Sequence, residues 1–309
     1  MENIKDISET IISPLAFKKG MFITSEETGS ISVGKYIKMY NKGVFNAEDM
    51  CILRYIYSAG YITRHSLSRV IETGDTCKKS LKKLRKHGLV SKNTLEFSAS
   101  KERGKIIDYY KLTSVGFQIC KVLGNGGKLN ITKALLNAFQ KPVSDLDTPE
   151  DILTQLAFNN FRCGIESDYK DLIKKTETHY TISYDKSFYT INALYELNLK
   201  SSGKNFLLIP VCARRAVGWK RALYSILTAA YQHIQSNFCY LVPVFIIIVE
   251  DAAMAADAFS NMSYHPFKNE TVLFATDWYV NRRNILDSLI FMRKYEPVEY
   301  DIVSLKYKC

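Results

Sequence analysis

Basic side chains gather on one short segment of the sequence, and their spacing suits a helix. Cys77, Leu81 and Leu84 recur at intervals of four and three residues and would form the core face of a helix from Thr76 to His87. Two neighbouring columns of that helix are basic, one made of Lys78, Lys82 and Arg85 and the other of Lys79, Lys83 and Lys86. Because a helix of this width fits the major groove, the segment predicts a surface for double-stranded DNA.

The residue types divide the expected contacts between bases and phosphates. Arginine is the commonest reader of guanine, so Arg85, together with Ser80, is expected at base edges and the lysines at phosphates. A second basic group, within a polar stretch that predicts the tip of a β-hairpin near an adjacent minor groove, consists of Lys101, Arg103 and Lys105. From Ile62 to Lys105, twelve basic and four acidic residues leave a charge of +8, out of +11 for the chain. The simpler alternative is a solvated lysine face, but the hairpin repeats the same sign of charge.

Caps and turns indicate the elements that would position these residues. Asn46 and Thr63 can cap two helices that precede the basic helix, and Thr113 can cap another one after the hairpin. A supporting helix, two helices joined by a short turn and a hairpin define a winged helix-turn-helix, which we expect over residues 46–124. Residues 1–45 are expected to form an arm or a small β-element in front of it.

The remainder of the chain is expected to form an α/β domain. Residues 125–150 predict a linker with a short helix, and residues 151–309 alternate between helical and strand patterns. A last helix is expected from Asp277 to Phe291. Three successive strands are expected near Tyr180–Tyr184, Thr190–Leu199 and Phe206–Ala213. The sequence therefore predicts an α+β protein, with a winged helix-turn-helix followed by an α/β domain.

Four stretches of the first predicted domain carry a family pattern: Ile52–Ile56, Tyr61–Thr63, Leu81–Val90 and Tyr110–Gly116. Together they resemble winged-helix proteins of the replication-relaxation type, which occur on plasmids and integrative elements of Gram-positive bacteria. In that family a domain like the PD-(D/E)xK restriction-endonuclease fold follows, and the order of helix, three strands, helix and strand is similar here. The resemblance implies sequence-specific DNA binding that serves plasmid or mobile-element replication, transfer or transcription control.

The resemblance also implies where a nuclease centre would lie. An active member would carry an acid on the second strand and an acid-x-Lys pair on the third. Asn192 stands where the first acid is expected, with Glu196 nearby, and the third strand, Phe206–Arg215, contains no acid. Carboxylates cannot build a Mg²⁺ site there, so we expect a degenerate, non-catalytic domain. A metal-dependent DNA nuclease or relaxase and a protein-interaction adaptor remain the alternatives.

A second basic cluster, at a strand-to-helix junction, consists of Arg214, Arg215, Lys220 and Arg221. It is read equally as a contact for DNA, phosphate or a partner and as a solvated helix start. The seven cysteines occur singly and the five histidines lack metal-binding spacing, so neither a metal nor a cofactor is expected. No apolar run is long enough for a membrane helix, so we expect a cytoplasmic protein. We also expect a homodimer, with other replication or transfer proteins as further partners.

Overall fold

The computed structural model divides the chain into two compact units. We call Phe17–Cys163 the helical unit, and Met1–Ala16 together with Gly164–Cys309 the sheet unit. The mixture of helices with two separate sheets confirms the α+β class. The structure describes residues 13, 15–26, 31–71, 74–99, 102–128, 147–198, 205–238, 240–262, 271–277, 280, 285, 289–293 and 296–300.

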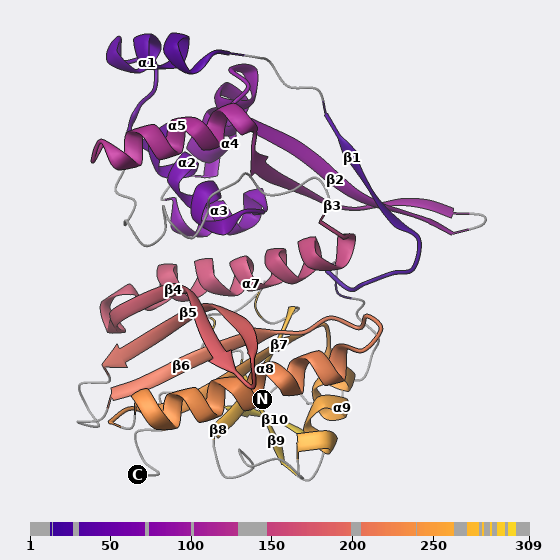
Figure 1. Ribbon diagram of the computed structural model, residues 1–309. Coiled ribbons are helices and arrows are strands. Elements are labelled where there is room, and N and C mark those ends of the chain that lie inside the picture. Colours follow the sequence, from indigo (N-terminus) through magenta and orange to yellow (C-terminus); the bar gives the residue numbers. More distant parts are fainter. Residues whose placement is uncertain are drawn as a thin grey trace. The chain divides into compact units, whose positions relative to one another are not determined.

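The helical unit is built around four helices and a β-hairpin (Figure 1). Asn46, Thr63 and Thr113 each accept a hydrogen bond from a backbone N–H of the first helical turn, which confirms the predicted caps. Gly60 ends the first of these helices with a φ of 70°, which glycine adopts without strain. The elements in chain order are α2 (Ala47–Ala59), α3 (Arg64–Val70), α4 (Gly74–Lys86), β2 (Val90–Ala99), β3 (Glu102–Leu112) and α5 (Ser114–Asn125).

A further strand and helix precede this core. Strand β1 (Met21–Ser25) pairs antiparallel with β2, so the sheet of this unit has the order β1-β2-β3. Helix α1 (Val33–Asn41) begins after Ser32, whose side chain accepts a hydrogen bond from the backbone N–H of Lys35. Figure 1 shows β1 running alongside the hairpin of β2 and β3. Residues 17–45 therefore belong to the helical unit, whereas Met1–Ala16 belong to the sheet unit.

Helix α7 (Pro149–Asp168) completes the helical unit by binding the turn between α2 and α3. The side-chain amide of Asn159 donates to the carbonyl oxygens of Ala59, at 2.9 Å, and Tyr61, at 2.7 Å. Gln155 also donates to the Ala59 oxygen, at 3.1 Å, and Arg162 donates to a neighbouring carbonyl of the same turn, at 3.3 Å. The last carbonyls of a helix lack partners within it, so α7 supplies the cap that α2 needs.

Replacing Asn159 by Ala should therefore destabilise the protein. The substitution leaves the buried Tyr61 carbonyl without its side-chain donor, and we expect a loss of about 2–3 kcal/mol in the free energy of unfolding. Gln155→Ala is the matched control, with an expected loss below about 1 kcal/mol, because Asn159 still donates to the oxygen that the two residues share. Urea unfolding of the full chain measures both, and equal losses would contradict this account of α7.

The helical unit and the domain predicted over residues 46–124 therefore differ in extent. The unit begins at Phe17 and ends at Cys163, because β1 adds a strand to the hairpin and α7 caps α2. The sequence instead assigns the start of α7 to the domain over 151–309. Of the predicted linker, residues 129–146 lie outside the described part of the chain.

The sheet unit contains a mixed sheet of the order β10-β9-β8-β7-β6-β5-β4. Strand β5 pairs antiparallel with both β4 and β6, strands β6, β7 and β8 are parallel, and β9 pairs antiparallel with both β8 and β10. A short 3-10 helix, η2 (Lys170–Leu172), precedes β4. The strands are β4 (Ile173–Tyr184), β5 (Ser187–Asn198), β6 (Asn205–Cys212), β7 (Val242–Val249), β8 (Thr271–Thr276), β9 (Leu289–Arg293) and β10 (Glu296–Tyr300).

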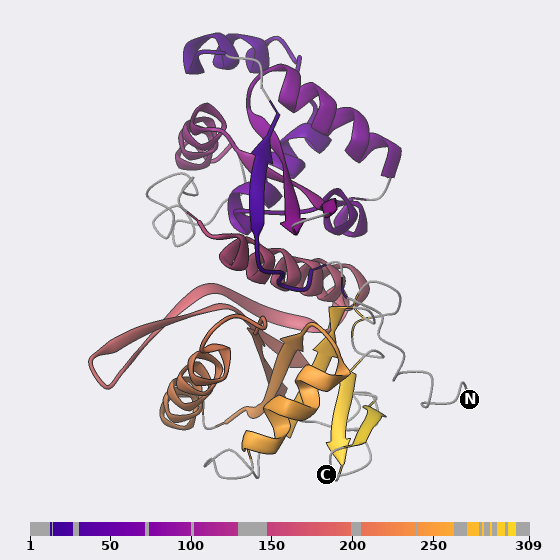
Figure 2. The same ribbon diagram turned by 90° about the vertical axis from the view of Figure 1, so that its right-hand side faces the viewer.

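Two helices of this unit pack on one face of its sheet (Figure 2). Buried residues of α8 (Trp219–Asn237) and α9 (Ala252–Met262) belong to the same apolar cluster as Phe245, Ile247 and Val249 of β7. Alternate residues of a strand point to the same face, so the two helices cover the same side. Parallel strands need such helical crossovers, and α8 and α9 provide them between β6 and β7 and between β7 and β8.

The predicted helix over Asp277–Phe291 is wrong over its last three residues, while residues 278–279, 281–284 and 286–288 lie outside the described part of the chain. Strand β9 begins at Leu289, where Leu289 and Ile290 are buried and pair antiparallel with Ala275 and Phe274 of β8. A short apolar run fits a strand as well as the last turn of a helix, and the pairing with β8 decides between them.

Among the described residues, no helix is long and apolar enough to cross a membrane.

Candidate nucleic-acid interface

Helix α4 presents a buried face to the core of the helical unit. Cys77, Leu81 and Leu84 are at most 2% exposed, which confirms the core face that the sequence predicts. Ser80 is also buried, at 4% exposure. This burial argues against the predicted contact of Ser80 with base edges, which stays a prediction.

Four lysines form the outward face of α4, which we call the lysine face: Lys78, Lys79, Lys82 and Lys86. All four side chains are exposed. Spacings of three, four, seven and eight residues bring them onto one side of a helix. Within the described part of the chain, none of them pairs with a carboxylate. The lysine face therefore keeps its full positive charge.

Lys83 turns away from this face toward helix α2. Its ammonium group lies 2.6 Å from a carboxylate oxygen of Asp49, a side chain with only 1% exposure. The same carboxylate accepts the backbone N–H of Asn46 at 3.0 Å and so also caps α2. The Lys83 ammonium also lies 5.6 Å from the centre of the Phe45 ring. Lys83 thus joins α4 to α2, and its charge is neutralised.

Arg85 turns to the other side and pairs with Glu26, the residue after β1. The second Glu26 oxygen lies 2.6 Å from the ammonium of Lys92 on β2, which also lies 3.3 Å from Asp108 on β3. We call these four residues the Glu26 cluster; its two cations and two carboxylates balance. The hydrogen bond from Lys92 lowers the pKa of Glu26, and the same bond raises the pKa of Lys92, so both stay ionised near neutral pH.

The two basic columns predicted on α4 are therefore replaced by one lysine face, bordered by two paired cations. Glu26 holds the guanidinium of Arg85, which argues against the predicted contact of Arg85 with a base, and that contact stays a prediction. The sequence suggests Asp49 only as a first-turn acid of α2, and it carries no signal for Glu26. A buried acid needs a cationic partner, so the burial of Asp49 is the signal that could have led to its pairing with Lys83.

The charge of the neighbouring histidine does not add to the lysine face. Burial, followed by the nearby cations Lys86 and Lys83, lowers the pKa of His87 below its usual value of 6.5. The imidazole is therefore neutral at pH 7, and its ring packs edge-on against Phe45 at 5.4 Å.

The predicted basic tip of the hairpin is only partly described. In the register of the hairpin, Arg103 lies opposite Ser98 and Lys105 lies opposite Glu96. Lys101 lies outside the described residues. The backbone positions of Arg103 and Lys105 agree with the predicted hairpin, and their contacts with DNA stay a prediction.

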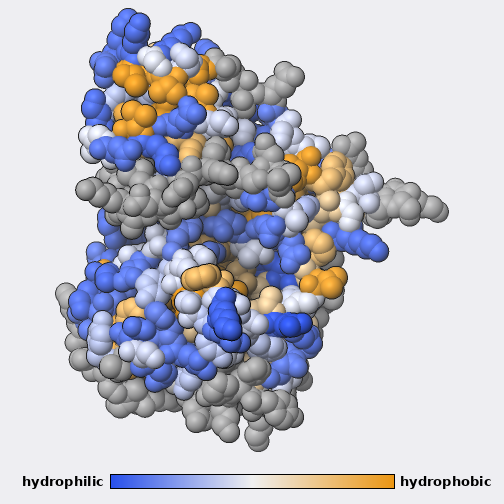
Figure 3. Space-filling model, in the orientation of Figure 1, coloured by the Kyte–Doolittle hydropathy of each residue, from blue (hydrophilic) through white to orange (hydrophobic). Residues whose placement is uncertain are grey.

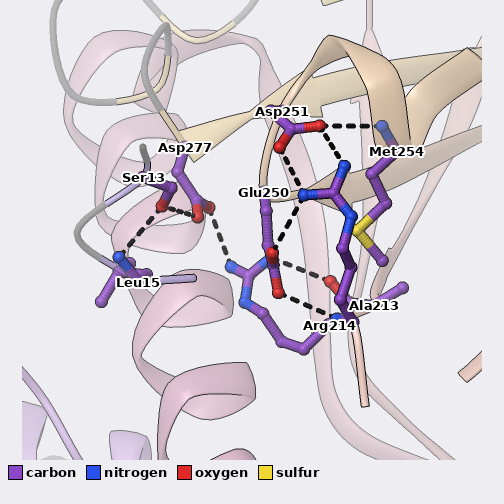
Figure 4. A network of polar contacts seen from close by, with 9 residues as sticks. Ser13, Leu15, Ala213, Arg214, Glu250, Asp251, Met254 and Asp277 are labelled. Atoms are coloured by element: carbon purple, nitrogen blue, oxygen red, sulfur yellow. Dashed lines mark hydrogen bonds and ion pairs between the residues drawn. The ribbon is translucent and has the colours of Figure 1, made fainter. Parts of the chain in front are cut away.

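The second basic cluster predicted from the sequence is largely neutralised (Figure 4). Arg214 is buried, and its guanidinium lies 2.8 Å from Asp277, which also accepts a hydrogen bond from Ser13. Arg215 makes two contacts with Asp251, at 2.5 and 2.6 Å, and Lys220 lies 2.6 Å from Asp257. Arg221 is exposed. Arg214, Arg215 and Lys220 are thus ion-paired, which argues against a basic patch here, and the predicted contact of this cluster with DNA, phosphate or a partner stays a prediction.

The strands discussed for a nuclease centre also carry a paired acid. Glu196 on β5 is 8% exposed and lies 2.6 Å from the ammonium of Lys174 on β4. Strand β6 contains no acid. The described residues contain no group of three or more acidic, histidine or cysteine side chains placed to hold a metal ion. Glu196 therefore stands in an ion pair rather than in a cluster of carboxylates.

The exposed large apolar side chains among the described residues are Val44, Val122, Phe188, Val217 and Tyr240. Figure 3 shows hydrophilic side chains over much of the drawn face and hydrophobic ones gathered near α5, where Val122 is 48% exposed.

Comparison with known proteins finds no match: neither a protein-family model, nor a curated protein, nor a solved structure is similar to this chain. The function must therefore be argued from the site itself.

Two adjacent lysines of α4 should behave differently when substituted. Lys83→Met leaves the buried Asp49 carboxylate without its cation, and we expect a loss of about 2–3 kcal/mol in the free energy of unfolding. Lys82→Met changes an exposed side chain and should alter that free energy by less than about 0.5 kcal/mol. Denaturant titration of both variants checks the assignment, which fails if the two losses are the same.

Proposed function

We propose that this chain is a winged helix-turn-helix protein that binds double-stranded DNA through the lysine face of α4. The observation that carries the proposal is the contrast on this one helix: its core face is buried, its bordering cations are paired and its four outward lysines are not. A surface that only needed solubility would gain nothing from leaving four like charges side by side. Polyanions relieve this repulsion, and DNA provides regularly spaced phosphates.

The order of elements supports the same proposal. Helices α2, α3 and α4 followed by the hairpin of β2 and β3 are the parts of a winged helix-turn-helix, in which the third helix enters the major groove. Ile62, between α2 and α3, forms a bridge with Tyr110 of β3, which ties the helices to the hairpin. In this arrangement the lysine face would meet phosphates and base edges, and the hairpin would approach the neighbouring groove.

The lysine face should determine the salt dependence of binding. Each phosphate contact that is lost reduces the slope of log affinity against log salt by about 0.9, so Lys82→Ala with Lys86→Ala should reduce it by nearly 2. Lys220→Ala is the control, because this lysine is paired with Asp257 in the sheet unit and should leave the slope unchanged. Fluorescence anisotropy with a labelled duplex over a salt series measures the slope. Absence of binding at low salt would eliminate the proposal.

Base recognition should depend on the first turns of α4, since the N-terminal residues of a recognition helix contact base edges. Lys78 and Lys79 are the exposed cations there, and lysine can donate to guanine. We expect Lys79→Ala to weaken the preference for a selected site by about 1–3 kcal/mol, and Arg85→Ala to leave that preference unchanged. Affinities for a fragment selected from genomic DNA and for a scrambled duplex give the comparison. A preference that depends on Arg85 instead would show that Glu26 releases it on DNA.

We propose that the sheet unit is a degenerate nuclease-like fold without catalytic activity, whose role is oligomerisation or contact with a partner. Two antiparallel pairings, β4 with β5 and β5 with β6, followed by a helix and a parallel strand, support this reading. The absence of acids from β6 supports the lack of activity. Magnesium-dependent cleavage of plasmid DNA that is lost in Glu196→Ala would overturn it in favour of a nuclease. The process served would be replication, transfer or transcription control of a mobile element.

A further inference from the structure

The Glu26 cluster holds two cations at the junction of α4 and the hairpin. One carboxylate uses its two oxygens for two partners, Arg85 of α4 and Lys92 of β2. The side chains of these cations are only 28% and 20% exposed, and the buried Nε of Arg85 has no hydrogen-bond partner. Both cations are thus drawn toward the protein, although they come from the two elements that would contact DNA.

The position of Arg85 makes this withdrawal significant. Arg85 follows Lys78 by seven residues and Lys82 by three, so it borders the lysine face on the same side of the helix. An unpaired guanidinium at this place would add a phosphate contact beside the four lysines. Lys92 would add another from the base of the hairpin. Glu26, itself 45% exposed, also places a negative charge where phosphates would approach.

We propose that Glu26 is a specificity-determining residue, which withholds Arg85 and Lys92 from phosphates and so limits sequence-independent binding to DNA. This inference rests on the proposed function. Phosphate contacts strengthen binding to all sequences alike, whereas base contacts distinguish them. A protein that must find one site among many gains selectivity when it makes fewer phosphate contacts. Glu26, the residue after β1, therefore sets the ratio of base contacts to phosphate contacts.

The test is the isosteric variant Glu26→Gln in the full chain. The variant releases Arg85 and leaves Lys92 with only its 3.3 Å contact to Asp108, so the affinity for a duplex of mixed sequence should rise about threefold or more and the salt slope should steepen by about 1–2. The ratio of affinities between a fragment selected from genomic DNA and the mixed duplex should fall. Glu26→Ala should give the same results, and circular dichroism melting verifies that both variants fold.

Two controls separate this effect from a change in net charge. Asp257→Asn removes one carboxylate from a 2.6 Å pair with Lys220 in the sheet unit and should leave affinity and slope unchanged. Glu26→Gln in an Arg85→Ala, Lys92→Ala background should give no gain, because the cations that it would release are missing. An equal gain with Asp257→Asn, a gain that persists in that background, or no change with Glu26→Gln would each overturn the inference. Failure of the unmodified chain to bind DNA would instead overturn the proposed function itself.

Discussion

The candidate interface depends on one buried carboxylate. Asp49 is almost completely removed from water, and a charge in such a place must have hydrogen bonds and a counter-ion. The backbone N–H of Asn46 and the ammonium of Lys83 provide them, at 3.0 and 2.6 Å. Asp49 therefore determines both where α2 begins and how α4 is rotated about its own axis. With Lys83 turned inward, the remaining lysines of α4 must point outward.

The same electrostatic rule sorts the described basic residues of α4 and of the second basic cluster. Where a carboxylate lies within reach, the cation is turned toward it: Arg85 toward Glu26, Arg215 toward Asp251 and Lys220 toward Asp257. Where none does, as on the outer side of α4, the cations stay in solvent. The net charge of +11 thus says little about where a polyanion would bind, because the arrangement of the acids determines which cations remain available.

Local patterns predicted the local features correctly. Asn46, Thr63 and Thr113 cap the helices that their residue types indicate, and the apolar spacing of Cys77, Leu81 and Leu84 gives the core face of α4. These signals act within one turn or one helix, so they survive in the sequence.

Long-range contacts could not be predicted in the same way. Glu26 and Arg85 are 59 residues apart, and Asn159 lies about a hundred residues from the carbonyls that it caps. No periodicity connects such residues. The sequence pattern therefore predicts Arg85 at the DNA and the start of α7 in the second domain. The helical wheel also gave no reason to separate Ser80 and Lys83 from the residues beside them, because burial depends on neighbours from other elements.

The sheet unit takes residues from both sides of the helical unit in the sequence, and this connectivity constrains synthesis. Ser13 donates its hydrogen bond to Asp277, a residue 264 positions later. The helical unit is continuous and can fold once α7 has left the ribosome, in keeping with the habit of domains to fold as they emerge. Ser13 leaves the ribosome much earlier, but its partner Asp277 is made only after the whole helical unit. Ser13 must therefore wait for Asp277 until well after the helical unit has been made.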